Sequence, residues 1–505
     1  MSGQTVRVNV AGIIDGHPDE AVALVAGERT VTYGQLRRDV AGLQAGLAGL
    51  GLDVGDRVGV VARNNVEFVV GWLAAARGGF VAVPLNPGSP LPELTHELAA
   101  VGARAVVCGP FGSEVVRRLD RGELPVLEHV VVTEAPVPDG GHLIGDLVAA
   151  PPADLVERDA GDLALLMFTS GTAGSPRAAM LTHGNLLANL DQVNRTDARR
   201  RGPDDVALAI LPLFHIFGLN VVLDGGLLAG STIVLMDQYD ADAALRAVAE
   251  QKVTDLTGPP TMWGDLARSE GAAPDVVGSV IRAASGAAAL GEEVRLLVRE
   301  RLGIDLAEGY GLTETAPVVA TGVGIDAPAG SVGRVIPGVE VRIVDADGDD
   351  TFIGDPGEIL VRGDNVFVGY WNDPEATRAV LDEDGWLHTG DIGFADEEGN
   401  LFLSDRAKDL IIVSGFNVFP AEVEEALCSH PSVDEAAVVA VPSERTGEAV
   451  KAFVVAAEGA RPSVDELRDH VGAHLARYKC PSEIEVVAEL PHGPSGKVLR
   501  RTLRS

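Results

Sequence analysis

The stretch ALLMFTSGTAGSPR, residues 164–177, decides the fold of this chain. Its first five residues are apolar and predict a buried strand, and a loop of hydroxyl-bearing residues and glycines follows. A helix-like stretch then starts at His183. Glycines let backbone N–H groups approach an anion closely, and Ser and Thr hydroxyls donate to phosphate oxygens. The Walker pattern G-x-x-x-x-G-K-[ST] is absent. The stretch indicates a phosphate-binding loop or, taken alone, an ordinary turn.

Outward from this loop, short apolar stretches alternate with helix-like ones. Residues 33–50 and 66–76 carry apolar side chains at helical spacing. Strands are expected at residues 57–62, 80–84, 103–108, 129–133, 206–211, 232–236 and 279–284. This alternation predicts an α/β fold whose parallel sheets are covered by helices.

The pattern changes from about Val332 onward. Short strands at 339–344, 357–362 and 401–403 are separated by Gly, Asp and Pro turns, which predicts an antiparallel β region. A smaller α+β unit follows, with helices at 420–428 and 463–475 and strands at 410–413, 436–441, 451–456 and 483–487. We therefore expect a large N-terminal domain (1–404), a charged hinge (405–409) and a small mobile C-terminal domain (410–505).

Composition excludes several classes of protein. The 505 residues include 40 Lys+Arg and 74 Asp+Glu, a net charge of −34, which argues against nucleic-acid binding. The cysteines Cys108, Cys428 and Cys480 form no C-x-x-C pair, which fits a reducing cytoplasm. We read no signal peptide at the start, and the longest apolar region, 68–84, is interrupted by Arg77 and glycines. We expect a cytoplasmic protein without an integral membrane segment, and its oligomeric state stays open.

Five further motifs follow the glycine-rich loop in a fixed order. They are EGYGLTET (308–315), LHTGD (387–391), SDRAKD (404–409), VSGFNVFPAEVE (413–424) and PSGKVLR (494–500). With the earlier stretches VTY (31–33) and LPLFH (211–215), they resemble the AMP-forming acyl-CoA synthetases of the adenylate-forming superfamily. The bacterial fatty-acyl-CoA ligases and 4-coumarate-CoA ligase-like enzymes are the most similar members, and the resemblance covers essentially the whole chain.

The resemblance implies a ligase with two half-reactions. A carboxylic acid attacks the α-phosphate of ATP and gives acyl-AMP and pyrophosphate, with Mg²⁺ as the metal. The thiol of coenzyme A then displaces AMP and gives a thioester. The implied partners are thus the acid, ATP and coenzyme A.

The resemblance also assigns roles at the nucleotide. The β- and γ-phosphates would be held by Thr169, Ser170, Gly171, Thr172, Gly174 and Arg177. The adenine pocket would be lined by Gly286, Ala287, Ala288, Glu308, Gly309, Tyr310 and Gly311, with Tyr310 stacking on the base. Thr313 would contact the α-phosphate and Glu314 would bind Mg²⁺, an ion that prefers oxygen ligands. Asp391 would accept from the ribose hydroxyls, supported by Arg406.

Three roles fall in the last hundred residues. Lys497 would bridge the attacking carboxylate and the α-phosphate, where the alternative is a solvated lysine of the tail. Lys408 would be the hinge on which the small domain swings, where the alternative is a solvated linker charge. Ser414 and Gly415 would line the coenzyme A tunnel.

The acyl pocket is assigned to Phe214, His215, Phe217, Gly218, Trp263 and Gly286. His215 would orient the carboxylate, although a lone histidine in an apolar run is more often a core residue. No candidate brings a charge to read a polar substituent, so we favour a medium- or long-chain fatty acid over an aryl acid of the 4-coumarate type.

The sequence departs from the family pattern at three places. Arg177-Ala178 stands where relatives have Lys-Gly, and Ala173 replaces a frequent Thr. Asp237-Gln238-Tyr239 stands where coenzyme A ligases often carry a basic residue before an aromatic one. The last departure leaves a carrier protein open as the thiol acceptor. A non-catalytic acyl-adenylate binding protein is disfavoured because Glu314, Asp391 and Lys497 are all present.

Overall fold

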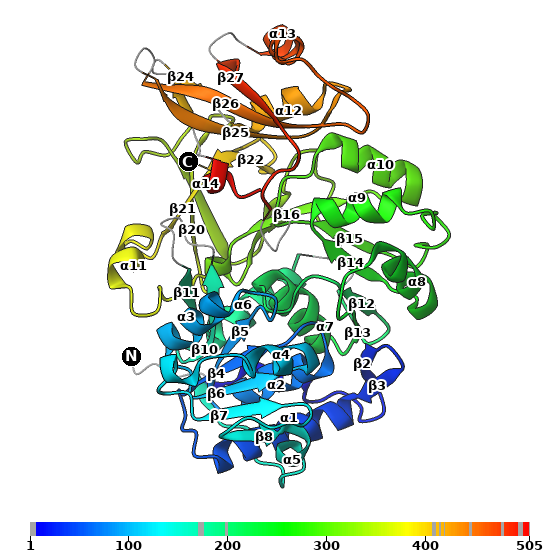
Figure 1. Cartoon of the computed structure of the whole chain (residues 1–505), viewed down its shortest axis with the longest axis vertical. Helices are drawn as coiled ribbons and strands as arrows, with labels where there is room; N and C mark the ends of the chain where they lie inside the picture. The colour runs from blue at the N-terminus through cyan, green and yellow to red at the C-terminus, as the bar shows by residue number, and fades with distance from the viewer. Residues whose placement is uncertain are drawn as a thin grey trace.

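The computed structural model describes most of the chain. The described residues are 7–169, 176–196, 200–406, 411–413, 416–418, 420–443, 447–475, 479–492 and 498–503. The fold is mixed α/β, as the sequence predicts, with two large sheets, a smaller antiparallel sheet and a small C-terminal unit (Figure 1).

The first large sheet has seven strands in the order β11-β10-β5-β4-β6-β7-β8. Their bounds are β4 (Arg57–Val61), β5 (Val81–Leu85), β6 (Ala105–Cys108), β7 (His129–Val132), β8 (Gly141–Leu143), β10 (Leu163–Thr169) and β11 (Arg177–Thr182). Neighbours pair in parallel except β10 and β11, which are antiparallel. The helices of this region are α1 (Tyr33–Gly49), α2 (Val66–Arg77), α3 (Leu91–Val101), α4 (Pro110–Val116), α5 (Ile144–Val148) and α6 (His183–Asn194).

Helix α2 shows how the sequence sets these elements. Its N-cap, Asn65, accepts from the backbone N–H of Phe68, and the first turn carries Glu67 and the last turn Arg77, as the helix dipole favours. The ten residues other than Glu67 and Arg77 are buried, Trp72 completely. A helix that is apolar on all sides belongs inside the domain, and α2 lies between β4–β6 and α1.

The second large sheet has nine strands in the order β18-β17-β16-β15-β14-β12-β13-β2-β3. Their bounds are β2 (Val22–Ala26), β3 (Arg29–Thr32), β12 (Val206–Ala209), β13 (Thr232–Leu235), β14 (Asp255–Gly258), β15 (Arg282–Ser285), β16 (Ala307–Gly311), β17 (Val318–Thr321) and β18 (Arg334–Val335). One face packs against α8 (Ala241–Gln251), α9 (Pro260–Arg268) and α10 (Glu292–Leu302). The other face packs against a π-helix (Phe217–Asp224) that continues into α7 (Gly225–Leu228).

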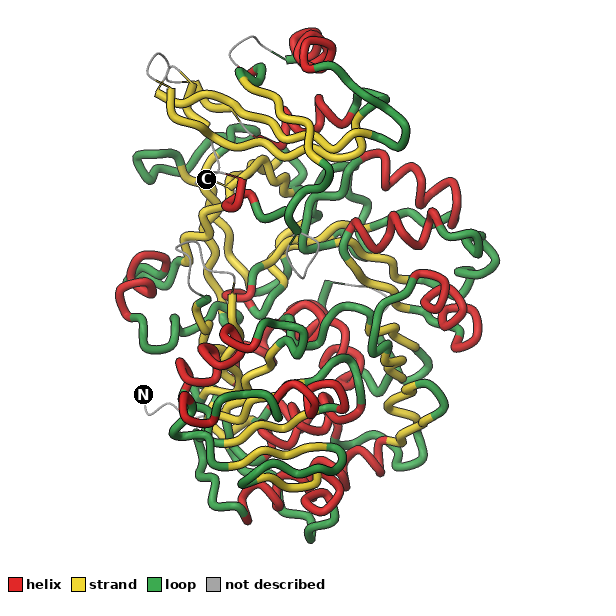
Figure 2. The backbone as a smooth tube through the Cα atoms, viewed as in Figure 1, coloured by secondary structure: helices red, strands yellow, loops and turns green. Residues whose placement is uncertain are grey.

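The remaining sheets are smaller. An antiparallel sheet joins β19 (Val339–Val344), β20 (Gly357–Gly363), β21 (Leu387–Ala395) and β22 (Leu401–Arg406), with α11 (Pro374–Val380) beside it. The C-terminal unit holds β23 (Ile411–Val413), β24 (Phe416–Val418), β25 (Val433–Ser443), β26 (Gly447–Ala456) and β27 (Glu483–Val487), with α12 (Pro420–Cys428), α13 (Val464–His474) and α14 (Arg500–Leu503). This unit has its own apolar core and lies at the end of the molecule opposite β7 and β8 (Figures 1 and 2).

The structure differs from the sequence-based expectation at two points. A strand, β11, comes between the glycine-rich loop and α6, because residues 177–182 pair along β10 in a hairpin. Strand β22 continues to Arg406, beyond the expected domain end at residue 404, since Arg406 pairs with Asp391 on β21. Both strands belong to the large unit.

Within the described residues, no helix is both long enough and apolar enough to cross a membrane.

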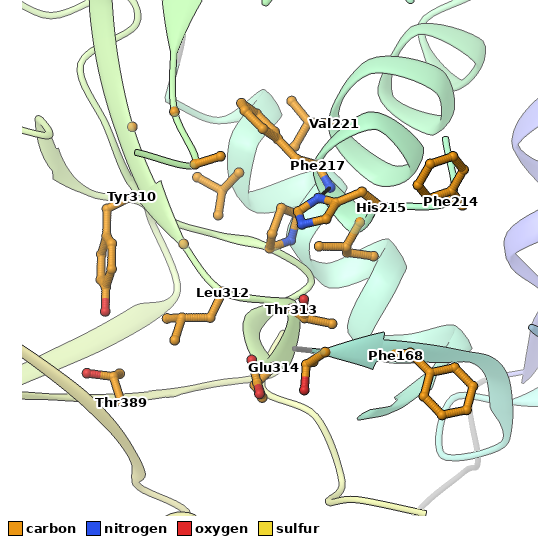
Figure 3. Close-up of a pocket in the computed structure, with 18 of the residues that line it drawn as sticks. Phe168, Phe214, His215, Phe217, Val221, Tyr310, Leu312, Thr313, Glu314 and Thr389 are labelled. Carbon is orange, nitrogen blue, oxygen red and sulfur yellow. Dashed lines mark hydrogen bonds between the residues drawn. The ribbon is translucent and has the colours of Figure 1, made fainter. Parts of the chain in front are cut away.

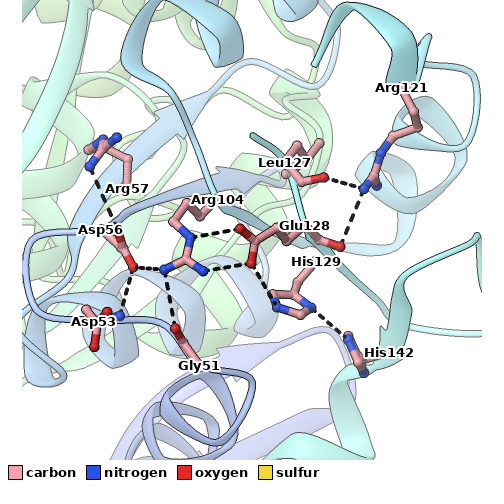
Figure 4. A network of polar contacts seen from close by, with 10 residues as sticks. All are labelled: Gly51, Asp53, Asp56, Arg57, Arg104, Arg121, Leu127, Glu128, His129 and His142. Carbon is pink, nitrogen blue, oxygen red and sulfur yellow. Dashed lines mark hydrogen bonds and ion pairs between the residues drawn. The ribbon is translucent and has the colours of Figure 1, made fainter. Parts of the chain in front are cut away.

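A polar network fastens the N-terminal edge of the first sheet (Figure 4). Asp56, Arg104 and Glu128 each immediately precede or lie next to the start of a parallel strand, β4, β6 and β7. Arg104 Nη1 donates to Asp56 Oδ2 at 2.6 Å, and Arg104 Nη2 donates to Glu128 Oε2 at 2.7 Å. The network joins three strand starts on the edge opposite the strand ends where α/β sheets bind ligands.

Candidate active site

One large cavity of about 1320 Å³ is lined by most of those predicted site residues that the structure describes. It lies between the ends of β10 and β16, the π-helix, the segment 387–390 of β21 and residues 498–502 of the C-terminal unit. Elements far apart in the sequence thus contribute to one space, and Figure 3 shows part of its wall. The strand ends that meet here are carboxyl ends, the usual position of a binding crevice in a parallel sheet.

The predicted nucleotide residues fall into three groups. Those that line the cavity are Thr169, Arg177, Gly286, Ala287, Gly309, Tyr310, Gly311, Thr313 and Glu314. Those outside the lining are Glu308 and Asp391, which are buried next to lining residues, and Ala288, which is exposed. Those outside the described residues are Ser170, Gly171, Thr172, Gly174 and Lys497, together with Lys408, Ser414 and Gly415. Arg406 is described only by its backbone, which pairs with Asp391.

Tyr310 and Asp391, two residues predicted to lie at the nucleotide, contact each other. The Tyr310 hydroxyl donates to Asp391 Oδ2 at 2.7 Å, and both residues are buried. The Asp391 backbone N–H donates to Thr389 Oγ1 at 3.0 Å, and that hydroxyl donates to the Ile359 carbonyl. Thr389 and Gly390 line the cavity next to Asp391. The carboxylate is therefore fixed in orientation, and a carboxylate can accept from a pair of vicinal hydroxyls.

Glu308 supports the adenine side from behind. Its carboxylate contacts Arg295 Nη2 at 2.5 Å and accepts from the Leu290 backbone N–H at 3.4 Å. These contacts tie the loop after β15 to α10. In that loop Ala287 has φ +69°, a left-handed conformation unusual for a residue with a side chain. Glu308 thus holds the loop in place, and the small residues of the loop line the cavity.

Glu314 occupies the position expected for a metal ligand. It lies in the 3₁₀ turn Thr313–Thr315, and its Oε1 accepts from the Tyr370 hydroxyl at 2.7 Å. Burial, together with the Glu314 carboxylate, raises the pKa of Tyr370, so its phenol remains a donor. Mg²⁺ typically binds one or two carboxylates plus substrate phosphates. The donor set fits such an ion: Glu314 lines the cavity, and no cluster of three metal-ligating side chains occurs among the residues that the structure describes.

Arg177 lies close to Glu314 and carries a partner of its own. Its Nε is 3.2 Å from Asp373 Oδ2, and its guanidinium carbon lies 5.7 Å from the centre of the Tyr370 ring. Arg177 still lines the cavity. The planar guanidinium can bind Asp373 at one edge and present other N–H groups to a phosphate.

His215 points into the cavity beside Phe217 (Figure 3). Its Nδ1 accepts from the Phe217 backbone N–H at 3.3 Å. Burial lowers the pKa of His215, so the ring is neutral near pH 7 and its hydrogen lies on Nε2. A neutral N–H donor at this place can hold a carboxylate oxygen without an additional charge.

The structure brings together part of the predicted acyl pocket. Phe214, His215, Phe217 and Gly286 line the cavity. A Cβ at Gly286 would lie 3.0 Å from the Phe217 ring, so the glycine makes room for that ring. Gly218 and Trp263 do not belong to the lining: Gly218 packs against the Pro212 carbonyl, and Trp263 is fully buried on the other face of β15, where its Nε1 donates to the Ala284 carbonyl.

One wall of the cavity is polar, which the sequence did not reveal. Arg201, Asp255, Thr257 and Arg282 all line the cavity. Arg201 Nε lies 2.6 Å from Asp255 Oδ2, and Arg282 Nη1 lies 3.3 Å from Asp205 Oδ2. We call this group the polar floor. A signal did exist in the sequence, because charged residues open the otherwise uncharged strands β14 and β15.

The end of the chain reaches the cavity from the C-terminal unit. Val498, Leu499, Arg500 and Thr502 are part of its lining. Arg500 holds this segment in place, with Nη2 at 2.6 Å and Nε at 3.2 Å from the two carboxylate oxygens of Glu424. Lys497 lies outside the described residues, and its neighbour Val498 lies at the cavity wall.

Comparison with known proteins agrees with this architecture. A model of the AMP-binding enzyme family matches residues 13–371, and one of the AMP-binding enzyme C-terminal domain matches residues 422–497. Feruloyl-CoA synthase of Amycolatopsis sp is 38% identical over 96% of this chain and 95% of its own. 4-Coumarate–CoA ligase 3 of Oryza sativa subsp. japonica is 36% identical over 98% of this chain and 88% of its own.

A solved structure gives the same result in three dimensions. ATP-bound MatB from Rhodopseudomonas palustris superposes with a TM-score of 0.90 at 32% identity, covering 99% of this chain and 98% of its own. Two family models in the predicted order and relatives similar over nearly the whole length leave one assignment. The chain belongs to the AMP-binding enzyme family, among the adenylate-forming CoA ligases.

Proposed function

We propose that this protein is an ATP-dependent CoA ligase for an aromatic carboxylic acid of the hydroxycinnamate type. The acid is adenylated at its carboxylate with loss of pyrophosphate, and the thiol of coenzyme A then displaces AMP. Family membership supports the ligase chemistry, and the names of the relatives, 4-coumarate–CoA ligase and feruloyl-CoA synthase, support an aromatic acid.

At the nucleotide end, each group has a role that its surroundings support. We assign the ribose hydroxyls to Asp391, which Tyr310 and Thr389 orient. We assign Mg²⁺, which neutralises the phosphates, to Glu314, and the α-phosphate to Thr313 in the same turn. The loop 169–175 and Arg177 bind the outer phosphates, and Lys497 stabilises the charge that develops at the α-phosphate.

The polar floor is the observation that carries the choice of acid. The fatty-acid prediction rested on an acyl pocket without charges, and that premise does not hold for the cavity wall. Arg201 and Asp255 line it, and their side chains are 13% and 4% exposed. An alkyl tail that covered this ion pair would remove water from it without returning hydrogen bonds, which is costly. A short, flat acid with a polar end avoids that cost.

The names of the relatives support coenzyme A as the thiol that accepts the acyl group. Asp237, the departure noted in the sequence, accepts from Asn65 Nδ2 at 3.1 Å and lies 3.6 Å from Arg63 Nη1. Arg63 therefore places a cation beside the acidic residue, over the ring of Phe111 at 3.9 Å. We propose that the small domain, from the connector after Arg406 onward, moves between the half-reactions, with Lys408 as the hinge. A cytoplasmic location stays a prediction.

The test is an acid panel with separate readouts. The purified chain is given ATP and Mg²⁺ with 4-hydroxycinnamate, cinnamate, benzoate, decanoate or palmitate, and with coenzyme A, with a phosphopantetheinylated carrier protein or with neither. Pyrophosphate, AMP and thioester are measured separately. We expect pyrophosphate release to be fastest with a cinnamate and thioester to form only with coenzyme A. Faster turnover of decanoate or palmitate would overturn the aromatic assignment, and thioester only on the carrier would overturn the acceptor.

A further inference from the structure

The part of the cavity that we assign to the acid runs along one face of the second sheet, from the carboxyl ends of its strands to their amino ends. Arg282 begins β15, and Gly286 follows that strand four residues later. At about 3.3 Å per residue, the polar floor lies about 13 Å from Gly286 along the strands. Asp255 is the register partner of Arg282 on β14 and also lines the cavity. An acid whose carboxylate lies near Gly286 therefore points its far end at Arg201 and Asp255.

Within the described residues, only two of the three guanidinium nitrogens of Arg201 have a hydrogen-bond acceptor. Its Nε contacts Asp255 Oδ2 at 2.6 Å, and its Nη1 donates to the Val221 carbonyl at 2.7 Å. Its Nη2 has no acceptor among the residues that the structure describes, although Arg201 is a lining residue. A guanidinium donor in an enclosed wall loses free energy unless a ligand or water accepts from it.

Asp255 lies next to that donor and can accept a further hydrogen bond. Its Oδ2 accepts from Arg201 Nε, and its Oδ1 accepts from Thr257 Oγ1 at a long 3.3 Å. A carboxylate has about four acceptor sites, so Asp255 can accept one more hydrogen bond. An arginine donor and an aspartate acceptor side by side match a group that both accepts and donates, which a hydroxyl does.

We propose that Arg201 and Asp255 bind the ring hydroxyl of the acid and so determine its specificity. The hydroxyl oxygen accepts from Arg201 Nη2, and its hydrogen is donated to Asp255. The pair is neutral as a whole, so a second carboxylate on the ring is disfavoured by Asp255. This proposal rests on the proposed function, because it takes the acid to be aromatic.

The test compares three acids that differ only in the para substituent: 4-hydroxycinnamate, 4-methoxycinnamate and cinnamate. We measure kcat/KM for adenylation with the unmodified protein. A hydrogen-bonded pair of this kind predicts a preference of roughly 10- to 100-fold for the hydroxyl over hydrogen. The methoxy acid, which accepts but cannot donate, should fall between the two. Equal values for 4-hydroxycinnamate and cinnamate would overturn this inference and leave the aromatic assignment standing. Failure of all three acids beside an active decanoate would overturn the proposed function itself.

Variants of the pair test whether Arg201 and Asp255 cause the preference for the ring hydroxyl. The double variant Arg201→Met with Asp255→Leu removes the pair together, so that no buried charge is left alone. We expect its preference for the hydroxyl to fall to within about threefold of unity while its activity on cinnamate rises or holds. Thr257→Val is the milder probe, isosteric and without the hydrogen bond to Asp255, and it should change the preference by a few-fold. A hydroxyl preference that persists undiminished in both variants would contradict the assignment.

A matched control lies outside the cavity. Arg104→Met removes an arginine with the same 2.6 Å contact to an aspartate, at the edge of the first sheet (Figure 4). It should leave the preference for the hydroxyl unchanged. A similar loss in this control would show that the effect of the double variant comes from destabilisation, and the inference would fail.

Discussion

Two arginine–aspartate pairs of this protein have the same geometry and different surroundings. Arg104 Nη1 with Asp56 Oδ2 and Arg201 Nε with Asp255 Oδ2 are both 2.6 Å contacts near the starts of parallel strands. Arg104 also donates to both oxygens of Glu128 and to the Gly51 carbonyl, so each of its nitrogens has a partner. Arg201 keeps one nitrogen without an acceptor in the described part of the chain, and it lines the cavity.

The difference separates a structural contact from a binding contact. A partly exposed pair whose donors all have partners contributes little beyond fastening its loops. An enclosed pair with a donor and an acceptor site left over can recognise a ligand, because a partner that completes it is preferred to one that does not. The ion pair itself is common to both regions, and the unused hydrogen-bonding capacity is what differs.

The largest expected effect belongs to a residue distant from both pairs. Lys497→Ala should slow adenylation by roughly 10²–10³, the scale for losing one preorganised charge stabiliser. It should largely spare thioester formation from supplied acyl-AMP, and it should slow 4-hydroxycinnamate and cinnamate equally, since Lys497 acts at the carboxylate. Quench-flow measurement of each half-reaction checks this. Equal losses in both half-reactions would refute the assigned role.

Tyr310→Phe probes the nucleotide end. The change removes the 2.7 Å hydrogen bond to the buried Asp391 carboxylate. The KM for ATP should rise by roughly tenfold, because Asp391 loses its fixed orientation. The ratio between hydroxylated and unsubstituted acids should not move. An unchanged KM for ATP, or a changed ratio, would show that the two ends of the cavity are coupled through this residue.

Gly286→Ala acts on the width of the acid pocket. The new Cβ would lie 3.0 Å from the Phe217 ring and push it into the cavity. We expect kcat/KM for cinnamates to fall about fivefold, while a straight-chain acid such as hexanoate is affected less. Adding Phe217→Leu should restore part of the loss. An equal loss of kcat/KM for both acids, with no recovery when Phe217→Leu is added, would argue against a ring beside Gly286.

Asp224→Asn tests the stability of the wall that carries Phe217. Asp224 ends the π-helix, is fully buried and accepts from Trp72 Nε1 at 3.0 Å. Burial raises the pKa of Asp224 to about 7. Between about pH 4, the pKa of an unfolded aspartate, and pH 7, the folded state holds a proton that the unfolded state releases. The free energy of unfolding should therefore fall as pH rises to 7 and level off above it.

Asn lacks this titration, so urea unfolding at pH 5, 6, 7 and 8 separates the two proteins. As pH rises, the free energy of unfolding of the variant should increase relative to that of the unmodified protein, by an amount on the order of a few kcal/mol at pH 8. Parallel stability curves across this range would contradict a buried carboxyl of raised pKa. The preference for a ring hydroxyl should be the same in both proteins.

The fold and the set of residues assigned to the nucleotide could be proposed from sequence because their signals are contiguous. The apolar strand at 164–168 and its loop, or Tyr310 to Glu314, stand together along the chain. The hairpin partner β11 was missed, since its pairing with β10 is visible only once the chain has turned back. The assigned roles of the individual site residues stay predictions.

The polar floor could not be assembled from sequence for a related reason. Arg201, Asp255 and Arg282 come from three separate segments, and each taken alone is typical of a solvated charge in a loop or at the start of a strand. Strand register brings Asp255 beside Arg282, and the π-helix covers this face of the sheet. Trp263 was predicted to line the pocket, but α9 places it on the opposite face of β15.

The most direct measurement is a crystal structure of the protein with 4-hydroxycinnamoyl-AMP, the product of the first half-reaction that we propose. The account predicts the AMP beside Tyr310 and Asp391, the ring next to Phe217 and Gly286, and the hydroxyl oxygen within about 3.2 Å of both Arg201 Nη2 and an Asp255 oxygen. A ring whose hydroxyl points away from this pair, toward solvent or toward the nucleotide, would contradict it.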